Sequence, residues 1–471
     1  MLAFALCLAL FVWFGYLGLA LLSLLHSRRN LLQNALLAPA IGSALLVVMT
    51  FWLSRAGLPV GQFAVALAVV LTVLASLVLW RIPPKFPTRR YLPFAATLVV
   101  AALITGRPMF EFGFQWVSIA NDDMANYVLS ARRFLQRGYD DKPTAEAIEN
   151  NQSMPDYFYY VYHDTGARPG SDLLLAVVTK LTGLDGFKVF MPLIVSLHLV
   201  LITTATALAC QHRFHRWPAL LAMVLLTFSP LLTLGASLQL IAQVFGLSML
   251  AAAALLLLRP LTPMPLRSSI RYGLLAGLVL SAAVIIYAEI VPFLFASLFV
   301  YLALCFLRDR SFRPATITPM LLAGLSTLLM LNRFAVEAAA YVLVQIGDGT
   351  KTHAQEIYLF PFFLLPTGLA NFWGILPMRE YPSNPWVLNL SIAFGGLLLA
   401  LAFLASCWQS WRLQPAAVVC AIMFCLAGYL FIKRADYGLY KLAMFIQPFL
   451  LPTLVRAWLR FHGDIYPEQA Q

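Results

Sequence analysis

The sequence predicts an all-α protein, a polytopic bundle of about thirteen transmembrane helices whose external loops carry short amphipathic helices. The chain has 471 residues, of which 61% are hydrophobic and only 11% are charged. That is more apolar surface than one soluble core can bury. The basic residues gather mainly in short clusters between apolar runs, as they do in the loops of membrane proteins. The formal charge of +12 therefore indicates membrane orientation, and we expect no nucleic-acid partner.

The expected transmembrane helices follow from apolar runs of spanning length. The first run, residues 2–25, has no basic region before it, so we interpret it as a retained helix rather than a signal peptide. The run at 272–307 is too long for one helix, and Glu289 and Pro292 near its middle predict a tight hairpin of two helices that turns at the YAE step. The other runs lie at 31–54, 62–80, 91–106, 186–209, 218–235, 237–258, 315–331, 387–409, 415–432 and 438–455.

The basic clusters predict the side of the membrane that each loop faces. Lys and Arg in short loops stay on the cytoplasmic side. The two long segments, 107–185 and 333–386, then face outwards and carry most of the acidic residues. We expect the inner (plasma) membrane of a bacterium, with the polar chemistry on its periplasmic face and membrane lipids around the bundle. The clusters that fall on the cytoplasmic side are at 26–29, 81–90, 211–216, 259–271 and 308–313.

Five parts result from this division. Residues 356–377 are the least certain in topology, because a span there would invert everything that follows, and the basic residues of the last third mildly favour that inversion. Their prolines favour a re-entrant or interfacial segment, so we place them outside. The parts are N-terminal helices (1–106), a large external loop with an acidic motif (107–185), helices that include a broken hairpin near 287–292 (186–332), a second external or re-entrant segment (333–386) and C-terminal helices (387–471).

The stretch NDDMANY places Asp122 and Asp123 side by side at the start of the large external loop. One interpretation is structural: Asn121 caps a helix over 122–137, the two acids favour its first turn, and its apolar stripe lies on the membrane surface with Arg132, Arg133 and Arg137 towards lipid phosphates. The other is catalytic. Two adjacent carboxylates repel each other, which raises the pKa of one and suits it to take a proton from an alcohol.

An acidic pair in the first large external loop, amid about a dozen helices, resembles the GT-C glycosyltransferases. These integral membrane enzymes take a sugar from a polyprenyl-phosphate carrier. The resemblance implies that Asp122 or Asp123 deprotonates the acceptor, which would be a protein, a lipid or a glycan. NDDMANY is also similar to the Asp-Asp motif of the arabinosyltransferase branch, which uses polyprenyl-phospho-arabinofuranose. Here the motif follows the fourth expected helix rather than the first, so three helices would be an N-terminal addition.

A second set of charges, KRADYGLYK, lies between two apolar runs near the C-terminus. Lys433, Arg434 and Lys441 are candidates for binding the phosphate of the lipid donor, because Arg offers a planar fork and Lys a point charge to such an anion. The alternative is a cytoplasmic positive-inside loop in an inverted topology.

Three further residues are candidate substrate contacts. Glu289 is an ionisable group inside an apolar hairpin, and such groups in membranes are usually functional, although it could equally cap the turn. His163 and Arg168 lie in YHDTGARPGSD, where His163 could carry a proton. Turn chemistry is the commoner explanation for such a cluster.

No cofactor is required by this scheme, and a divalent cation such as Mg²⁺ or Ca²⁺ is compatible with the acidic pair without being demanded by it. The metal ligands, if any, stay unknown. The sequence contains no P-loop, GxGxxG, HExxH or GxSxG motif in its proper context. Two rival functions stay open: a polymerase or ligase that uses lipid-linked oligosaccharides, and a lipid or solute transporter.

Overall fold

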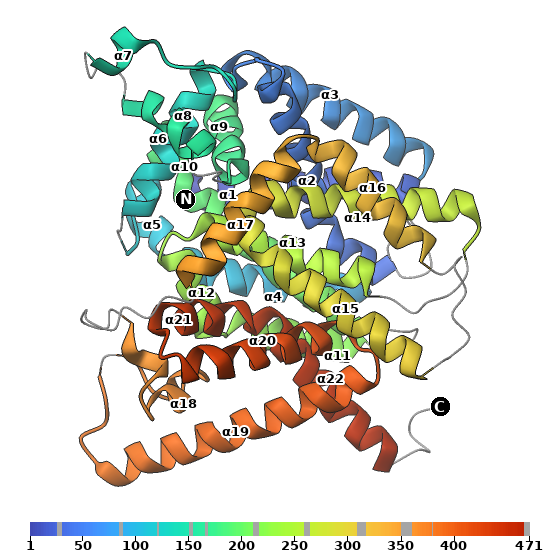
Figure 1. Cartoon of the computed structure of the whole chain (residues 1–471), viewed down its shortest axis with the longest axis vertical. Coiled ribbons are helices and arrows are strands. Elements are labelled where there is room, and N and C mark those ends of the chain that lie inside the picture. The colour runs from blue at the N-terminus through green and yellow to red at the C-terminus, as the bar shows by residue number, and fades with distance from the viewer. Residues whose placement is uncertain are drawn as a thin grey trace.

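The structure is a computed structural model. It describes residues 1–25, 31–83, 88–119, 122–149, 154–164, 168–210, 216–258, 264–308, 317–349, 360–378 and 380–465. All regular secondary structure in these ranges is helical, which confirms the predicted all-α class (Figure 1). Each expected apolar run is mainly helical over its described residues, with short breaks such as those at 228–229, 238–240 and 446. The reason is that a helix satisfies every backbone N–H and C=O within itself, as a segment in hydrocarbon must.

The long apolar helices form the body of the protein. Within the described residues, seven helices are long and apolar enough to cross a membrane. The number of candidate spans rises to eleven if each of four bent helix pairs counts as one span. The chain is thus a polytopic helical membrane protein. The seven are α1 (Leu2–Leu25), α2 (Leu31–Arg55), α3 (Val60–Arg81), α10 (Gly186–Ala209), the stretch Leu266–Arg308 with α14 (Leu266–Tyr287) and α15 (Val291–Arg308), α19 (Pro385–Trp411) and α20 (Pro415–Ile432); the apolar helix α13 (Ile241–Leu257) is shorter.

The four pairs of helices are bent by 51° to 99° at a short break. Two of the breaks lie at the expected ends of runs, after residues 106 and 331, and two lie inside the expected runs 218–235 and 438–455. The sequence predicted no bend inside these two runs, because an apolar run looks the same whether or not its helix is broken. The pairs are α4 (Thr88–Gly106) with α5 (Pro108–Phe112) and η1 (Gly113–Gln115), α11 (Arg216–Thr227) with α12 (Pro230–Ser237), α16 (Thr318–Leu331) with α17 (Phe334–Gly349), and α21 (Asp436–Phe445) with α22 (Gln447–Ile465).

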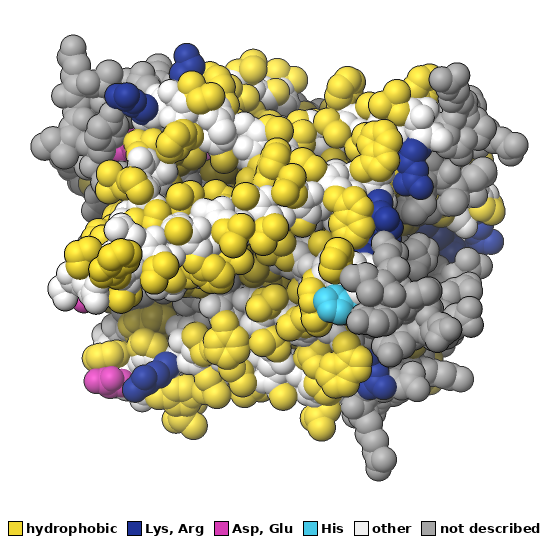
Figure 2. Space-filling view, turned by 90° about the horizontal axis from the view of Figure 1, so that it is seen from below, with side chains coloured by type: hydrophobic (Ala, Val, Ile, Leu, Met, Phe, Trp, Pro, Cys, Tyr) yellow, Lys and Arg dark blue, Asp and Glu magenta, His cyan; other side chains and the backbone are white. Residues whose placement is uncertain are grey.

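Helix α10 is the centre of the bundle. The apolar stretch of α10 is wholly buried within the protein, and the helix packs against α1, α2, α11, α13 and α22. By contrast, α19 lies at the edge of the bundle, and only 11% of its apolar stretch is buried within the protein. Figure 2 shows one face of the molecule covered by hydrophobic side chains, with charged side chains towards its two sides. This distribution is the one expected for a surface in contact with lipid.

The long run at 272–307 forms two helices, α14 and α15, joined by a short 3-10 turn, η3 (Ala288–Ile290). The break lies at the predicted YAE step, and Pro292 falls in the first turn of α15, where its missing N–H costs no hydrogen bond. The two helices diverge rather than forming the expected tight hairpin. Helix α14 packs mainly on α16 and α13, whereas α15 packs on α20.

The two segments expected to face outwards contain short helices. Within 360–378, the described part of the proline-rich segment, no helix is long enough to span. Residues 356–359 lie outside the described ranges. The short helices are α6 (Asp122–Gln136), α7 (Ala145–Glu149), η2 (Met154–Tyr157), α8 (Phe158–Asp164), α9 (Gly170–Thr182), η5 (Pro361–Phe363) and α18 (Gly368–Asn371).

Candidate functional site

Helix α6 begins at Asp122, as the sequence predicted, but it does not lie on the membrane surface. Met124, Val128 and Phe134 are buried, and the helix packs against α9, α3 and α10. Arg133 is only 1% exposed and donates hydrogen bonds to the backbone carbonyls of Tyr139 and Asp141. The expectation that this helix rests on lipid, with Arg133 towards the phosphates, is therefore wrong. Amphipathic periodicity marks an apolar face but not whether lipid or protein covers it.

The acidic pair is only partly described. Asn121 and the side chain of Asp122 lie outside the described residues. Asp123 is half-buried in the first turn of α6. One turn further along, burial raises the pKa of Tyr127 to about 12, while Arg168 opposes this shift and Asp172 and Asp123 add to it. Asp123 and Arg168 thus both lie in electrostatic range of Tyr127.

Arg168 and Glu289 form an ion pair between the start of α9 and the η3 turn. The same oxygen of Glu289, Oε1, accepts a hydrogen bond of 2.9 Å from the hydroxyl of Tyr341 on α17. The guanidinium carbon of Arg168 lies 4.6 Å from the centre of the Tyr287 ring, a cation–π distance. Burial lowers the pKa of Arg168, but Glu289, Tyr127, Tyr287 and Tyr341 together outweigh burial and raise that pKa above its ordinary value.

Lys441 joins these residues from the C-terminal part of the chain. Its ammonium group lies 4.8 Å from the centre of the Tyr437 ring, one turn earlier on α21. Both Lys441 and Arg168 lie in electrostatic range of Tyr287 and of each other. We call Arg168, Tyr287, Glu289, Tyr341 and Lys441 the Arg168 cluster.

Two glycines allow the close packing on which the Arg168 cluster depends. A Cβ on Gly170 would lie 2.7 Å from Cγ1 of Ile286 and 2.9 Å from the carbonyl oxygen of Ile285, so only glycine lets α9 begin this close to the end of α14. A Cβ on Gly246 of α13 would lie 2.4 Å from Cβ of Tyr287. These two contacts hold Arg168 beside Glu289 and fix the ring of Tyr287.

The charges of the Arg168 cluster do not cancel. It holds two cations, Arg168 and Lys441, and one carboxylate, Glu289, whose second oxygen, Oε2, is buried without a hydrogen-bond partner among the described residues. Tyr287, Tyr437 and Arg168 lie in electrostatic range of Lys441, and Asp172 lies in range of Arg168. The arrangement can therefore accept an anion, and tyrosine hydroxyls beside it can bond polar groups of a ligand.

Behind this cluster lies a carboxylate, Asp172, that no pattern in the sequence distinguishes. It stands on the first turn of α9 and is only 4% exposed. Its Oδ2 accepts hydrogen bonds from Ser130 of α6, at 2.9 Å, and from the hydroxyl of Tyr162 of α8, whereas its Oδ1 has no hydrogen-bond partner within the described ranges. Burial raises the pKa of Asp172 to about 7, against the opposing effects of Tyr162, Ser130 and Arg168. One side chain thus ties three helices together.

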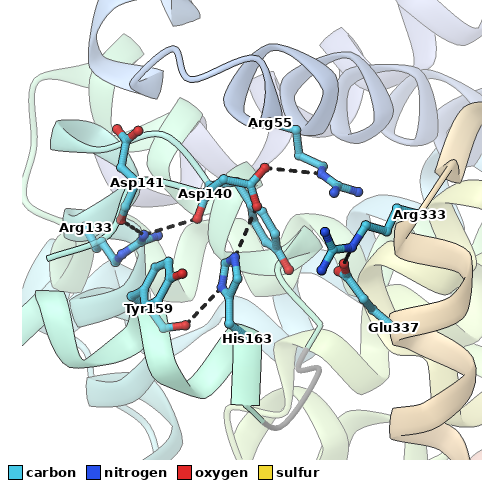
Figure 3. A network of polar contacts seen from close by, with 9 residues as sticks. Arg55, Arg133, Asp140, Asp141, Tyr159, His163, Arg333 and Glu337 are labelled. Carbon is cyan, nitrogen blue, oxygen red and sulfur yellow. Dashed lines mark hydrogen bonds and ion pairs between the residues drawn. The ribbon is translucent and has the colours of Figure 1, made fainter.

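His163 belongs to a different network, shown in Figure 3. Its Nε2 lies 3.1 Å from Oδ1 of Asp140, its Nδ1 lies 3.1 Å from the carbonyl oxygen of Tyr159, and its ring stacks on that of Tyr159. Asp140 also pairs with Arg55 at the end of α2, at 3.7 Å. These contacts anchor the large external loop to the bundle, so His163 is not brought to the Arg168 cluster.

The remaining predicted residues are Lys433 and Arg434. They are exposed in the turn between α20 and α21, where Arg434 has a φ of 55°. The structure therefore separates the predicted phosphate ligands into one half-buried residue, Lys441, and two exposed ones. It adds Tyr127, Tyr287 and Tyr341. Tyr127 ends the NDDMANY stretch and Tyr287 begins the YAE step, whereas Tyr341 had no signal in the sequence.

Within the described ranges no three His, Cys, Asp or Glu side chains converge as metal ligands would. No known family, curated protein or solved structure matches this chain. The residues themselves therefore carry the functional argument.

Proposed function

We propose that this chain is a membrane glycosyltransferase that moves a sugar, such as arabinofuranose, from a polyprenyl-phosphate donor to an acceptor on the outer face of the membrane. One observation carries the proposal. Arg168 and Lys441, from distant parts of the chain, lie together beside Tyr287 at a break between membrane helices, and the Arg168 cluster holds a single carboxylate to balance their charge. The phosphate of a lipid donor is an anion that can reach a site between membrane helices from the bilayer, and there it would bind to Arg168 and Lys441.

The chemistry is a displacement at the anomeric carbon of the sugar. The acceptor hydroxyl attacks that carbon, the bond from carbon to phosphate oxygen breaks, and polyprenyl phosphate leaves. Asp123 or Asp122 takes the proton of the hydroxyl, and Arg168 and Lys441 stabilise the charge on the departing phosphate. Glu289 keeps Arg168 in position, and the tyrosines are available to bond sugar hydroxyls. Lys433 and Arg434, on the exposed turn, attract the anionic headgroup.

The first test is an assay of the purified protein against a panel of polyprenyl-phospho-sugars, with detection of a glycosylated product. Lys441→Met removes the charge but keeps most of the apolar stem. We expect it to weaken donor binding by about 1.5–3 kcal/mol, which is roughly a 10- to 100-fold loss of affinity. Lys180→Ala is the matched control, since Lys180 is exposed on α9, and it should bind donor as the parent does. Equal affinity in all three proteins would contradict the role of Lys441.

A transporter is the second candidate, because discontinuous helices are typical of transporters. The α11–α12 break and the α21–α22 break lie in contact with each other. Oγ of Ser229, just before α12, lies 3.5 Å from Oε1 of Gln447, at the start of α22. Proteoliposomes separate the two functions. Movement of an intact lipid-linked sugar across the bilayer, with no new glycosidic bond, would favour the transporter and exclude our proposal.

A further inference from the structure

The outer face of α17 is apolar and exposed. Val336 and Leu343 are each 72% exposed, and Val344 is 60% exposed. With Ala340 they recur at the three- and four-residue spacing that places side chains on one face of a helix. The charged side chain nearest this face is that of Glu337, which lies at its edge in the first turn of α17 and pairs with Arg333. A contiguous apolar surface of this kind is rare in contact with water, so an apolar partner is expected to cover it.

The opposite face of α17 contacts the protein. Phe334, Ala338 and Tyr341 are buried there, and the helix packs chiefly on the η3 turn. Tyr341 is the residue that donates its hydroxyl to Glu289. Helix α17 therefore forms a wall, with the Arg168 cluster on one side and the unidentified apolar partner on the other.

The geometry of the preceding helix identifies that partner. Helix α16 is apolar, with Leu325, Leu328 and Leu329 exposed as lipid-facing residues are. At Asn332, whose φ is 52°, the chain turns by 99° into α17, and the bend is visible in Figure 1. The exposed polar residues Asn332 and Arg333 stand at the bend, between the exposed leucines of α16 and Val336. The run at 315–331 that contains α16 is expected from the sequence to cross the membrane, so a turn of 99° places α17 along the membrane plane, where apolar faces sink into the lipid boundary.

We infer that α17 is an interfacial helix whose Val336–Ala340–Leu343–Val344 face rests on membrane lipid, so that this single helix separates the bilayer from the Arg168–Glu289 pair. The start of the helix fits this position. Arg333 pairs with Glu337 at 3.0 Å, yet its side chain is 82% exposed, so the rest of its guanidinium is accessible to lipid headgroups. Contact with lipid then sets the position of α17 relative to the membrane, and with it the position from which the Tyr341 hydroxyl donates to Glu289. The inference does not depend on glycosyl transfer.

Spin labelling in proteoliposomes tests the inference. The exposed Cys407 and Cys425 are first replaced by alanine, and the four buried cysteines are kept. A nitroxide is then attached at Leu343→Cys. Two reference positions complete the set: Leu397→Cys on α19, which is 57% exposed on an apolar spanning helix, and Glu146→Cys on α7, which is exposed on a polar helix. Each label is relaxed in turn by oxygen, which concentrates in lipid, and by a water-soluble nickel chelate.

We expect the ratio of oxygen to nickel relaxation at position 343 to be severalfold higher than at position 146 and to approach the ratio at position 397. A ratio like that of position 146 would mean that water covers the face, and it would overturn the inference. A label that neither reagent reaches, with dipolar broadening between labels, would show instead that a second copy of the chain covers α17. That result would also overturn the inference.

Discussion

The buried carboxyl of Asp172 makes the stability of this protein depend on pH in a direction that can be stated in advance. Its ordinary pKa is 3.8, and burial raises the pKa to about 7 in the folded protein. The folded chain therefore holds this proton more tightly than the unfolded chain does. Its stabilising effect is fully present below about pH 4 and is lost as the pH rises through about 7.

The size of the effect follows from the shift. A difference of about three pKa units corresponds to about 4 kcal/mol between the two ends of this pH range, as an order of magnitude. Asp172→Asn cannot titrate, yet its amide oxygen can still accept from Ser130 and Tyr162. We therefore expect the variant to match the parent near pH 4, to exceed its stability near pH 8, and to lose most of the slope between them.

Thermal unfolding in detergent, followed by circular dichroism from pH 4 to pH 8, measures this difference. Because membrane proteins seldom unfold reversibly, the comparison uses midpoint temperatures of parent and variant at the same heating rate. Asp164→Asn is the control, since Asp164 is an exposed aspartate on α8, and its slope should equal that of the parent. A parent-like slope in Asp172→Asn would refute the reasoning.

Two further predictions concern the acidic pair and the packing of α9. Asp122→Asn and Asp123→Asn keep the size and polarity of the side chains; if one is the general base, its loss should lower turnover by about 10²–10⁴-fold with little loss of stability, and full sugar transfer in both folded variants would end the catalytic interpretation. Gly170→Ala should push α9 away from α14 and lower the midpoint of thermal unfolding, whereas Gly428→Ala, with open space around the added Cβ, should not; equal midpoints in the two variants would show that the contact at Gly170 is not tight.

The helices were predictable because hydrocarbon leaves the chain few alternatives. An apolar run of spanning length must satisfy its backbone internally, so such a run indicates both the helix and its approximate ends. The break at the YAE step was predictable for a similar reason, since Glu289 and Pro292 interrupt the run. The bends inside runs were not: nothing in the composition near residues 228–229 or 446 distinguishes a bend of 51° from a straight continuation. Near Asn332 the end of the span was predicted, but not the helix that follows it.

The sequence could not predict that the residues of the Arg168 cluster lie together, although it indicated three of them, Arg168, Glu289 and Lys441, as candidates. Arg168 and Glu289 are 121 positions apart, and Lys441 lies still further along the chain. No local pattern predicts contacts at such separations. Tyr341 lies in an apolar helix with no feature to select it, and Arg133 looked like a surface residue because basic side chains are seldom buried.

The Arg168–Glu289 pair is difficult to explain as a source of stability alone. A buried ion pair must recover the cost of removing two charges from water, and apolar residues of similar volume often serve stability as well or better. Among the described residues, this pair also leaves one carboxylate oxygen unpartnered and brings a second cation, Lys441, into range. Arrangements that violate the local rules of packing and charge are expected at functional sites, where the cost is offset only when a ligand arrives. An anion between Arg168 and Lys441 would remove the repulsion between them, which is why we assign the function here rather than to Asp172, whose hydrogen-bond donors, Ser130 and Tyr162, are uncharged.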